Sequence, residues 1–208
     1  MKQIEEKTNV MRILDGKKIK YNHYNYLESG AISGMEVAEA LNENPNMIFK
    51  TLVTVGKSGN HYVFLLPVNK ELDFKKAAKS VGEKNIEMIK SKELLPLTGY
   101  IHGGCSPIGM KKFFKTVIHE SASEFDKILF SGGKIGYQVE IRLQDLSKAI
   151  KYDLADIVVE QKRTSITLAQ IIAFYSPRLC LRAKFAKYLY YRKVIKRKKI
   201  KNENEEKK

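Results

Sequence analysis

The chain has no tryptophan, and its 208 residues include only two cysteines and five prolines. Cys105 and Cys180 lie far apart, so no disulfide framework is expected, and a reducing, cytoplasmic compartment is the natural one. No run of about eighteen apolar residues occurs, so no membrane-spanning helix is expected. The N-terminal segment mixes charges throughout and lacks the apolar core of a signal peptide. These absences favour a globular protein that is held together by one packed core.

The net charge of +15 is unevenly distributed along the chain. Of the 38 Lys and Arg residues, 15 lie at 161–208 beside 3 Glu, so that segment carries +12 and residues 1–160 carry only +3. We therefore expect a globular domain at 1–160 and a basic C-terminal extension, partly helical or disordered, at 161–208. The extension could contact RNA, which we rank first, lie on an anionic membrane surface, or have no selected function.

Apolar periodicity, caps and turn residues predict how helices and strands alternate along residues 1–160. Helices are predicted at 8–16, 35–42, after Asp73 to about residue 81, at 91–99, and from Asp145 to 153; strands are predicted at 19–26, 47–55, 61–68, 85–89, 116–122, 127–133 and 137–142. The segments 47–55 and 61–68 form a hairpin around the turn KSGN. Helices and strands in this mixed order indicate a single domain of the α+β or mixed α/β class.

Four stretches at 49–54, 65–79, 98–112 and 129–141 together resemble the YbaK/EbsC family of aminoacyl-tRNA deacylases. Their order and spacing carry the resemblance, which covers roughly residues 5–157 and leaves 161–208 outside. The resemblance implies a mixed, partly barrel-like β-sheet flanked by helices. It also implies a trans-editing enzyme that removes cysteine from tRNA(Pro) without a cofactor or metal. Mischarged tRNA is then the partner, with prolyl-tRNA synthetase as a second partner and no role for DNA.

Lys50 lies in the predicted strand 47–55 among apolar neighbours. Strand alternation places Lys50 and Leu52 on one face and Phe49 and Thr51 on the other. A lysine on a largely apolar strand needs a partner or a visiting ligand, although a rim lysine that extends to water explains the pattern too. The resemblance favours the first reading, because it links Lys50 to activity through the terminal nucleotide or the acyl group of the substrate.

The segment GGCSPIG at 103–109 predicts a tight loop. Gly103 and Gly104 allow close approach of a ligand to the backbone, and such a loop can point N–H groups at a developing oxyanion. A plain structural turn is the alternative. The resemblance implies that Gly103, Gly104, Ser106, Pro107 and Gly109 belong to the loop that lines the acyl pocket.

Three further site residues rest on the resemblance, and four lysines rest on their charge. Tyr26, Thr51 and Ser131 match pocket-lining positions, although Tyr26 also fits a core or surface tyrosine and Ser131 an ordinary turn. Lysines near the loop and on the predicted helix after Asp73 would meet acceptor-stem phosphates, with a solvated lysine face as the alternative. These tRNA-contact candidates are Lys75, Lys76, Lys111 and Lys112.

Cys105 raises the question of a thiol nucleophile, with His102 or His119 as its base. Such a nucleophile needs a base in contact and a lowered pKa, and the sequence indicates neither. The resemblance implies instead that the substrate's own thiol attacks its ester and releases a cyclic thiolactone. Two rival functions stay open: hydrolysis of Ala-tRNA(Pro) by water, and a non-catalytic RNA-binding or regulatory module.

Overall fold

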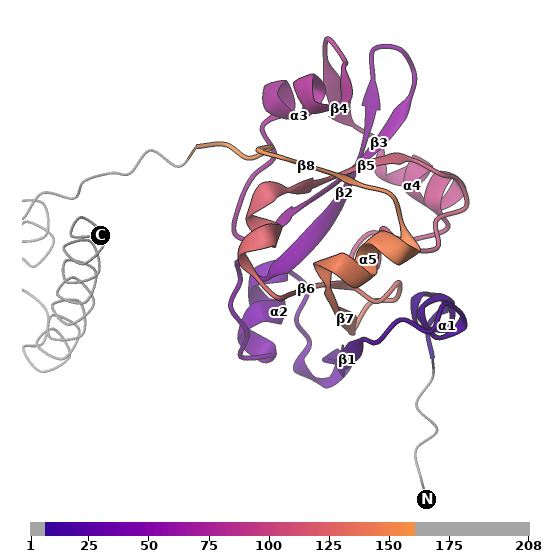
Figure 1. The fold of residues 1–208 in the computed structure, drawn as a ribbon, viewed down its shortest axis with the longest axis vertical. Coiled ribbons are helices and arrows are strands. Elements are labelled where there is room, and N and C mark those ends of the chain that lie inside the picture. Colours follow the sequence, from indigo (N-terminus) through magenta and orange to yellow (C-terminus); the bar gives the residue numbers. More distant parts are fainter. Residues whose placement is uncertain (1–6, 161–208) are drawn as a thin grey trace, which may run out of the picture. The chain divides into compact units, whose positions relative to one another are not determined.

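The computed structural model describes residues 7–160, in which helices alternate with the strands of one mixed sheet (Figure 1). Two short 3₁₀ helices, Leu27–Ser29 and Glu120–Glu124, lie between the regular elements. The helices are α1 (Asn9–Gly16), α2 (Gly34–Ala40), α3 (Phe74–Val81), α4 (Ser91–Thr98) and α5 (Leu143–Ala149), and the strands are β1 (Asn22–Asn25), β2 (Ile48–Gly56), β3 (His61–Pro67), β4 (Ile86–Met88), β5 (Lys115–His119), β6 (Lys127–Ser131), β7 (Tyr137–Arg142) and β8 (Asp153–Ala155).

Local capping sets the ends of the first three helices. The hydroxyl of Thr8 accepts a hydrogen bond from the amide of Met11 and begins α1. Ser33 and Glu36 form a reciprocal capping box at α2. Asp73 accepts from two amides at the start of α3, and Gly82, at φ 83°, ends that helix in the left-handed region. The three predicted helices are confirmed, with ends that differ from the predicted bounds by up to two residues.

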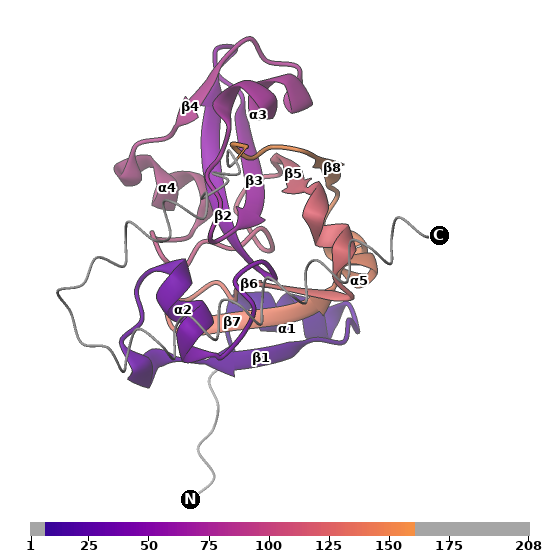
Figure 2. The same cartoon turned by 90° about the vertical axis from the view of Figure 1, so that its left-hand side faces the viewer.

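The sheet has the strand order β1-β7-β6-β2-β3-β5-β8, and β4 pairs with β2 beside this path. β2 and β3 form the predicted antiparallel hairpin, whereas the β2–β6, β3–β5 and β5–β8 pairs are parallel. The mixed sheet is thus confirmed, but it is not closed into a barrel, because β1 and β8 at the two ends of the path do not pair with each other. In Figure 2, β1 and β7 run across the direction of β2 and β3, which shows how strongly the sheet is coiled.

Two main groups of buried side chains flank the sheet. Val10, Met11 and Leu14 of α1 pack with apolar residues of β2, β6 and β7 such as Phe130. On the other side Ala77 and Ala78 of α3 pack with Phe64 and its neighbours. The coiled sheet therefore separates the core under α1 from the core under α3.

Several sequence predictions differ from the structure, and the first is the strand predicted at 19–26, which is only Asn22–Asn25. Arg142, not Asp145, is the N-cap of α5, and Asp145 lies in its first turn, where its carboxylate pairs with Lys148 at 2.5 Å. The helix ends at Ala149, and Asp153–Ala155 then forms β8 against β5. The predicted strand 116–122 ends at His119, because the ring of His119 accepts the amide of Ser121 and begins a 3₁₀ helix.

None of the helices between residues 7 and 160 is long and apolar enough to cross a membrane. The predicted basic extension at 161–208 and Cys180 lie outside the described residues, so the predicted domain boundary near 160 and the three hypotheses for the extension stay predictions.

Candidate functional site

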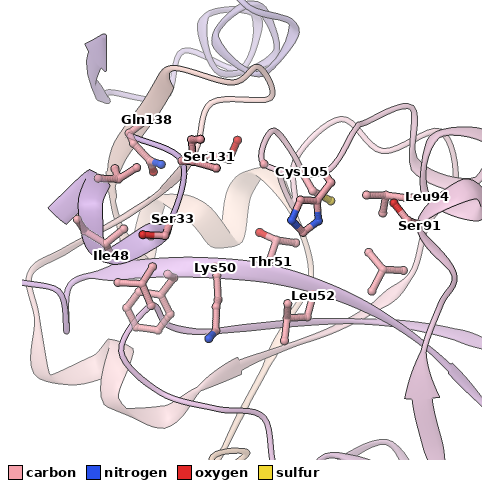
Figure 3. A pocket seen from close by; sticks show the side chains of 18 of the residues that line it. Ser33, Ile48, Lys50, Thr51, Leu52, Ser91, Leu94, Cys105, Ser131 and Gln138 are labelled. Carbon is pink, nitrogen blue, oxygen red and sulfur yellow. The ribbon is translucent and has the colours of Figure 1, made fainter. Parts of the chain in front are cut away.

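A cavity of about 440 Å³ opens where one edge of β2 lacks a partner strand (Figure 3). β6 pairs with this edge only at Ile48 and Phe49, and β4 only from Thr54 to Gly56. Residues 50–53 between these two pairings face the cavity. The start of α2, the start of α4, the loop at 102–105 and the facing ends of β6 and β7 form its other walls.

The hydrogen bonds of β2 show which peptide groups point toward the cavity. The amide of Val68 donates to the carbonyl of Ile48, so even-numbered residues of β2 exchange hydrogen bonds with the β3 side. The carbonyl of Val53 accepts from Ile89 on the opposite edge, so odd-numbered residues point that way. Because successive peptide groups alternate along a strand, the amide of Thr51 points to the open edge between β6 and β4. It is a backbone donor available to a ligand.

Lys50 brings a half-buried cation to this cavity. Loss of water lowers the pKa of its ammonium from the usual value, and the charge of Glu71 opposes that shift. Within residues 7–160 its Nζ forms no hydrogen bond or ion pair. Burying an unpaired charge is costly, so the site is set up to receive an anion or another strong acceptor from a ligand.

Two buried oxygens in the cavity wall also lack partners in the described chain. They are the hydroxyl Oγ1 of Thr51 and the amide Oε1 of Gln138, whose residue is only 7% exposed. An unsatisfied buried acceptor typically costs about 1–3 kcal/mol. Figure 3 shows Thr51 and Gln138 on the same side of β2, and Lys50 extending from its other side. A ligand group with several hydrogen-bond donors could donate to both oxygens.

The 103–109 loop divides between two cavities. Gly103 (φ 81°) and Cys105 line the cavity at β2. Gly104 packs on the turn after β6, where an added Cβ would lie 3.2 Å from the backbone nitrogen of Ile135. Pro107 and Gly109 line a second cavity instead. The expectation that the whole loop walls one pocket is therefore wrong for its second half.

Ser106 links the two halves of this loop from the inside. Its side chain is fully buried, and its hydroxyl accepts from the amide of Ile108 at 3.4 Å. The carbonyl of Ile108 accepts the hydroxyl of Tyr100 at 2.5 Å. Ser106 thus supports the loop and does not line either cavity.

Cys105 cannot act as an activated nucleophile in this environment. Burial raises the pKa of its thiol to about 12, so the thiol is protonated near neutral pH. His102 lines the same cavity from an exposed position, and no hydrogen bond joins it to Cys105 among the described contacts. His119 is engaged elsewhere, since its Nδ1 lies 2.7 Å from Ser121 Oγ and its Nε2 3.5 Å from an oxygen of Asp156.

Tyr26 and Ser131 both line the cavity, as the resemblance implied. Tyr26 is buried, and its amide donates to the carbonyl of Gly136, which fixes the chain at the end of β1. Ser131 Oγ accepts the amide of Gly133 at 3.3 Å. With Lys50, Thr51 and Gly103, five predicted residues therefore meet in one cavity.

The four predicted tRNA-contact lysines do not gather around this cavity. Lys76 pairs with Asp156 at 2.7 Å and with Glu160 at 3.4 Å, and its neighbour Lys75 is exposed on α3. Lys111 Nζ lies 3.4 Å from the carbonyl of Leu95. Lys112 lines the second cavity and not the first. Within residues 7–160, these four lysines therefore form no basic rim around the first cavity.

Sequence reasoning missed Gln138. The segment YQVEIR alternates with period two, and Gln138 was not among the predicted site residues, yet Gln138 and Glu140 are both buried. Glu140 is satisfied by Asn22 and Lys127. The side-chain oxygen of Gln138 has no such partner. A comparison of the polar residues on adjoining strands with the partners available to them could have indicated Gln138 as a site residue. Across residues 7–160 no three His, Cys, Asp or Glu side chains cluster as a metal site would require.

Comparisons with known proteins identify the family of the chain. The sequence pattern of the aminoacyl-tRNA editing domain matches residues 31–149. A protein of Enterococcus faecalis, named as a candidate Cys-tRNA(Pro)/Cys-tRNA(Cys) deacylase, EbsC, is 42% identical over 161 residues, which cover 77% of this chain and 98% of that protein.

Solved structures share the fold at low identity. A candidate trans-editing enzyme for prolyl tRNA synthetase superposes with a TM-score of 0.63 at 22% identity, over 74% of this chain and 99% of that one. A scaffold protein used for computational epitope grafting gives 0.64 at 22% identity, over 73% and 96%. The family pattern and the relative together establish that this chain belongs to the YbaK-type aminoacyl-tRNA editing domain family, the family of aminoacyl-tRNA deacylases that its motifs resemble.

Proposed function

We propose that this deacylase removes cysteine from mischarged tRNA(Pro), and that the thiol of the substrate cleaves its own ester. The observation that carries the proposal is the content of the cavity at β2. It offers a half-buried cation, two unsatisfied acceptors and a free backbone amide, while Cys105, the one thiol beside it in the described chain, is protonated. Such a cavity is suited to hold and orient a substrate. The name of the 42% identical relative supports cysteine as the amino acid.

Each polar group has a distinct task in this mechanism. The oxygens of Thr51 and Gln138 accept hydrogen bonds from the α-amino group of the aminoacyl ester. The ammonium of Lys50 holds an oxygen of the terminal nucleotide, because an unpaired cation favours a phosphate or ribose acceptor. The amide of Thr51 and the backbone at Gly103 face the ester carbonyl and stabilise its oxyanion.

The chemical step is an intramolecular displacement. The cysteine sulfur forms a bond to its own carbonyl carbon, and the bond from that carbon to the ribose oxygen breaks. The proton of the thiol ends on the ribose oxygen, which leaves as the hydroxyl of the tRNA terminus. The other product is a four-membered thiolactone. Holding sulfur and carbonyl in contact supplies the proximity on which such reactions depend.

Hydrolysis of Ala-tRNA(Pro) and RNA binding without catalysis are the competing functions, and one assay separates them. Cys-, Ala- and Pro-charged tRNA(Pro) are incubated with the full chain, and loss of each ester is followed. The proposal predicts rapid loss of the Cys ester alone. Faster loss of the Ala ester would assign the chain to water-mediated editing. Tight tRNA binding with no ester loss would contradict catalysis altogether.

A further inference from the structure

A second cavity of about 910 Å³ lies away from the open edge of β2, between α1, residues 107–116 and the segment from α5 to β8. In Figure 1 these elements lie together on the side of the sheet that carries α1 and α5. We call this cavity the lysine groove. Five lysines line it, whereas Asp153 is its one acidic lining residue in the described chain; the lysines are Lys17, Lys112, Lys115, Lys148 and Lys151.

Most of the positive charge of the lysine groove is unneutralised. Lys115 lies 3.9 Å from Asp153, and Lys148 pairs with Asp145. Lys17, Lys112 and Lys151 form no ion pair with any residue between 7 and 160. Lysines that repel one another across a concave surface favour a polyanionic occupant.

Two adjacent phenylalanines complete the groove and behave differently. Phe114 is partly buried, packs against the core and meets His61 edge to face with ring centroids 6.2 Å apart. Phe113 is fully exposed between Lys112 and Phe114. An exposed aromatic ring lacks the stabilisation that burial would give. An exposed ring next to lysines without ion pairs is typical of surfaces on which nucleic-acid bases stack.

We infer that the lysine groove binds the sugar–phosphate backbone of tRNA, with an unpaired base stacked on Phe113. The inference rests on the proposed function for the identity of the RNA. A flat anionic membrane would not enter a concave groove, whereas a nucleic-acid strand can follow it with phosphates on separated lysines.

The groove shares a wall with the catalytic cavity. Gly103 and Cys105 line the cavity at β2, and Pro107, Ile108 and Gly109 of the same loop line the groove. Ser106 and Tyr100 hold this loop by hydrogen bonds to Ile108. RNA in the groove would thus contact residues 107–109 of the loop, whereas residues 103–105 of the same loop face the acyl group in the cavity at β2. This placement gives Pro107 and Gly109 a role in substrate binding that differs from the predicted one.

Salt-dependent binding of uncharged tRNA(Pro) to the full chain tests the charge of the groove. The double variant Lys112→Gln/Lys151→Gln should lower the slope of log affinity against log salt by about 1.5 to 2 and weaken binding at least tenfold. The matched control Lys57→Gln/Lys84→Gln removes two exposed lysines that line neither cavity and should retain wild-type binding. An unchanged slope in the groove variant, or an equal loss in the control, would overturn the inference.

Phe113 provides an independent arm. Phe113→Ala should weaken tRNA binding by about tenfold with no change of salt slope. Phe113→Tyr should bind tRNA as the wild type does, because stacking requires the aromatic ring and not its apolarity. Equal binding by Phe113→Ala would overturn the stacking. Groove variants that lose binding to phosphatidylserine vesicles yet keep tRNA affinity would overturn the assignment of the groove to tRNA. Binding of uncharged tRNA is independent of ester cleavage, so a chain that binds through the groove but deacylates nothing contradicts the proposed function alone.

Discussion

The side chains of Lys50 and Thr51 leave β2 on opposite faces, yet both line the same cavity. The side chains of neighbouring strand residues point to opposite faces of a sheet and usually contact different surroundings. Here β6 and β4 pair with the two ends of the same edge of β2 and leave its middle open. A ligand at that open edge reaches both faces at once, together with the amide of Thr51. The interruption of the sheet, more than any single residue, creates the site.

Lys50→Met should abolish deacylation without weakening the fold. Removal of one preorganised electrostatic contact typically costs about 100-fold or more in rate. Because the ammonium is half-buried and unpaired in the described chain, methionine relieves desolvation and leaves no orphaned partner. Deacylation kinetics check the loss of activity, and thermal unfolding checks that the fold is retained. A normal rate would refute the role of Lys50, and a large drop in melting temperature would refute its unpaired state.

The same lysine predicts a pH dependence of stability. The pKa of Lys50 is lower in the folded chain than the ordinary lysine value of 10.5, so the unfolded chain binds more protons between these two pKa values. The free energy of unfolding should therefore gain a rising contribution as pH increases through that window. Denaturant titrations of Lys50→Met should lack this contribution, and a contribution of opposite sign in the wild type would show that the ammonium is stabilised by a partner.

Thr51→Val and Thr54→Val form a matched pair on β2. Both hydroxyls are buried without a partner, but only Thr51 lines the cavity. Each substitution should raise the free energy of unfolding by about 1 kcal/mol, because it removes an unsatisfied oxygen while nearly preserving shape. Only Thr51→Val should slow deacylation, by about tenfold for a lost hydrogen bond to substrate. If the two variants have equal rates, Thr51 Oγ1 does not bind the substrate.

Gln138→Leu should weaken substrate binding in the same way. The change removes an unsatisfied acceptor from the cavity wall, so the fold should be retained while kcat/KM falls about tenfold. Gln144→Leu on α5, outside the cavity, is the control and should behave as the wild type. Unaltered kinetics in Gln138→Leu would remove this side chain from the site.

Cys105→Ala should deacylate at close to the wild-type rate. With its pKa raised to about 12, the thiol is not a nucleophile near neutral pH and should resist iodoacetamide in the folded chain. The small cavity left by the sulfur should cost about 1 kcal/mol of stability. Loss of activity in a folded Cys105→Ala variant would restore the thiol as a participant.

Features fixed by neighbouring residues were predictable from the sequence, and features fixed by distant ones were not. Thr8, Ser33 and Asp73 act on amides within three residues, so the helix starts followed from local chemistry. β8 escaped prediction because three residues become a strand only by pairing with β5. The motif around Lys50 was visible, whereas the open edge that surrounds it depends on where β4 and β6 stop. Gln138 was missed because alternation does not tell a solvent face from a cavity wall.

The most direct test of the account compares two substrates that differ only at sulfur. Cys-tRNA(Pro) and its S-alkylated counterpart are incubated with the full chain under single-turnover conditions, and the released product is identified. Self-cleavage predicts rapid loss of the free-thiol ester with a thiolactone as first product, and no acceleration for the blocked ester. Equal rates for the two substrates, with cysteine and S-alkylcysteine as first products, would contradict it and assign the attack to water.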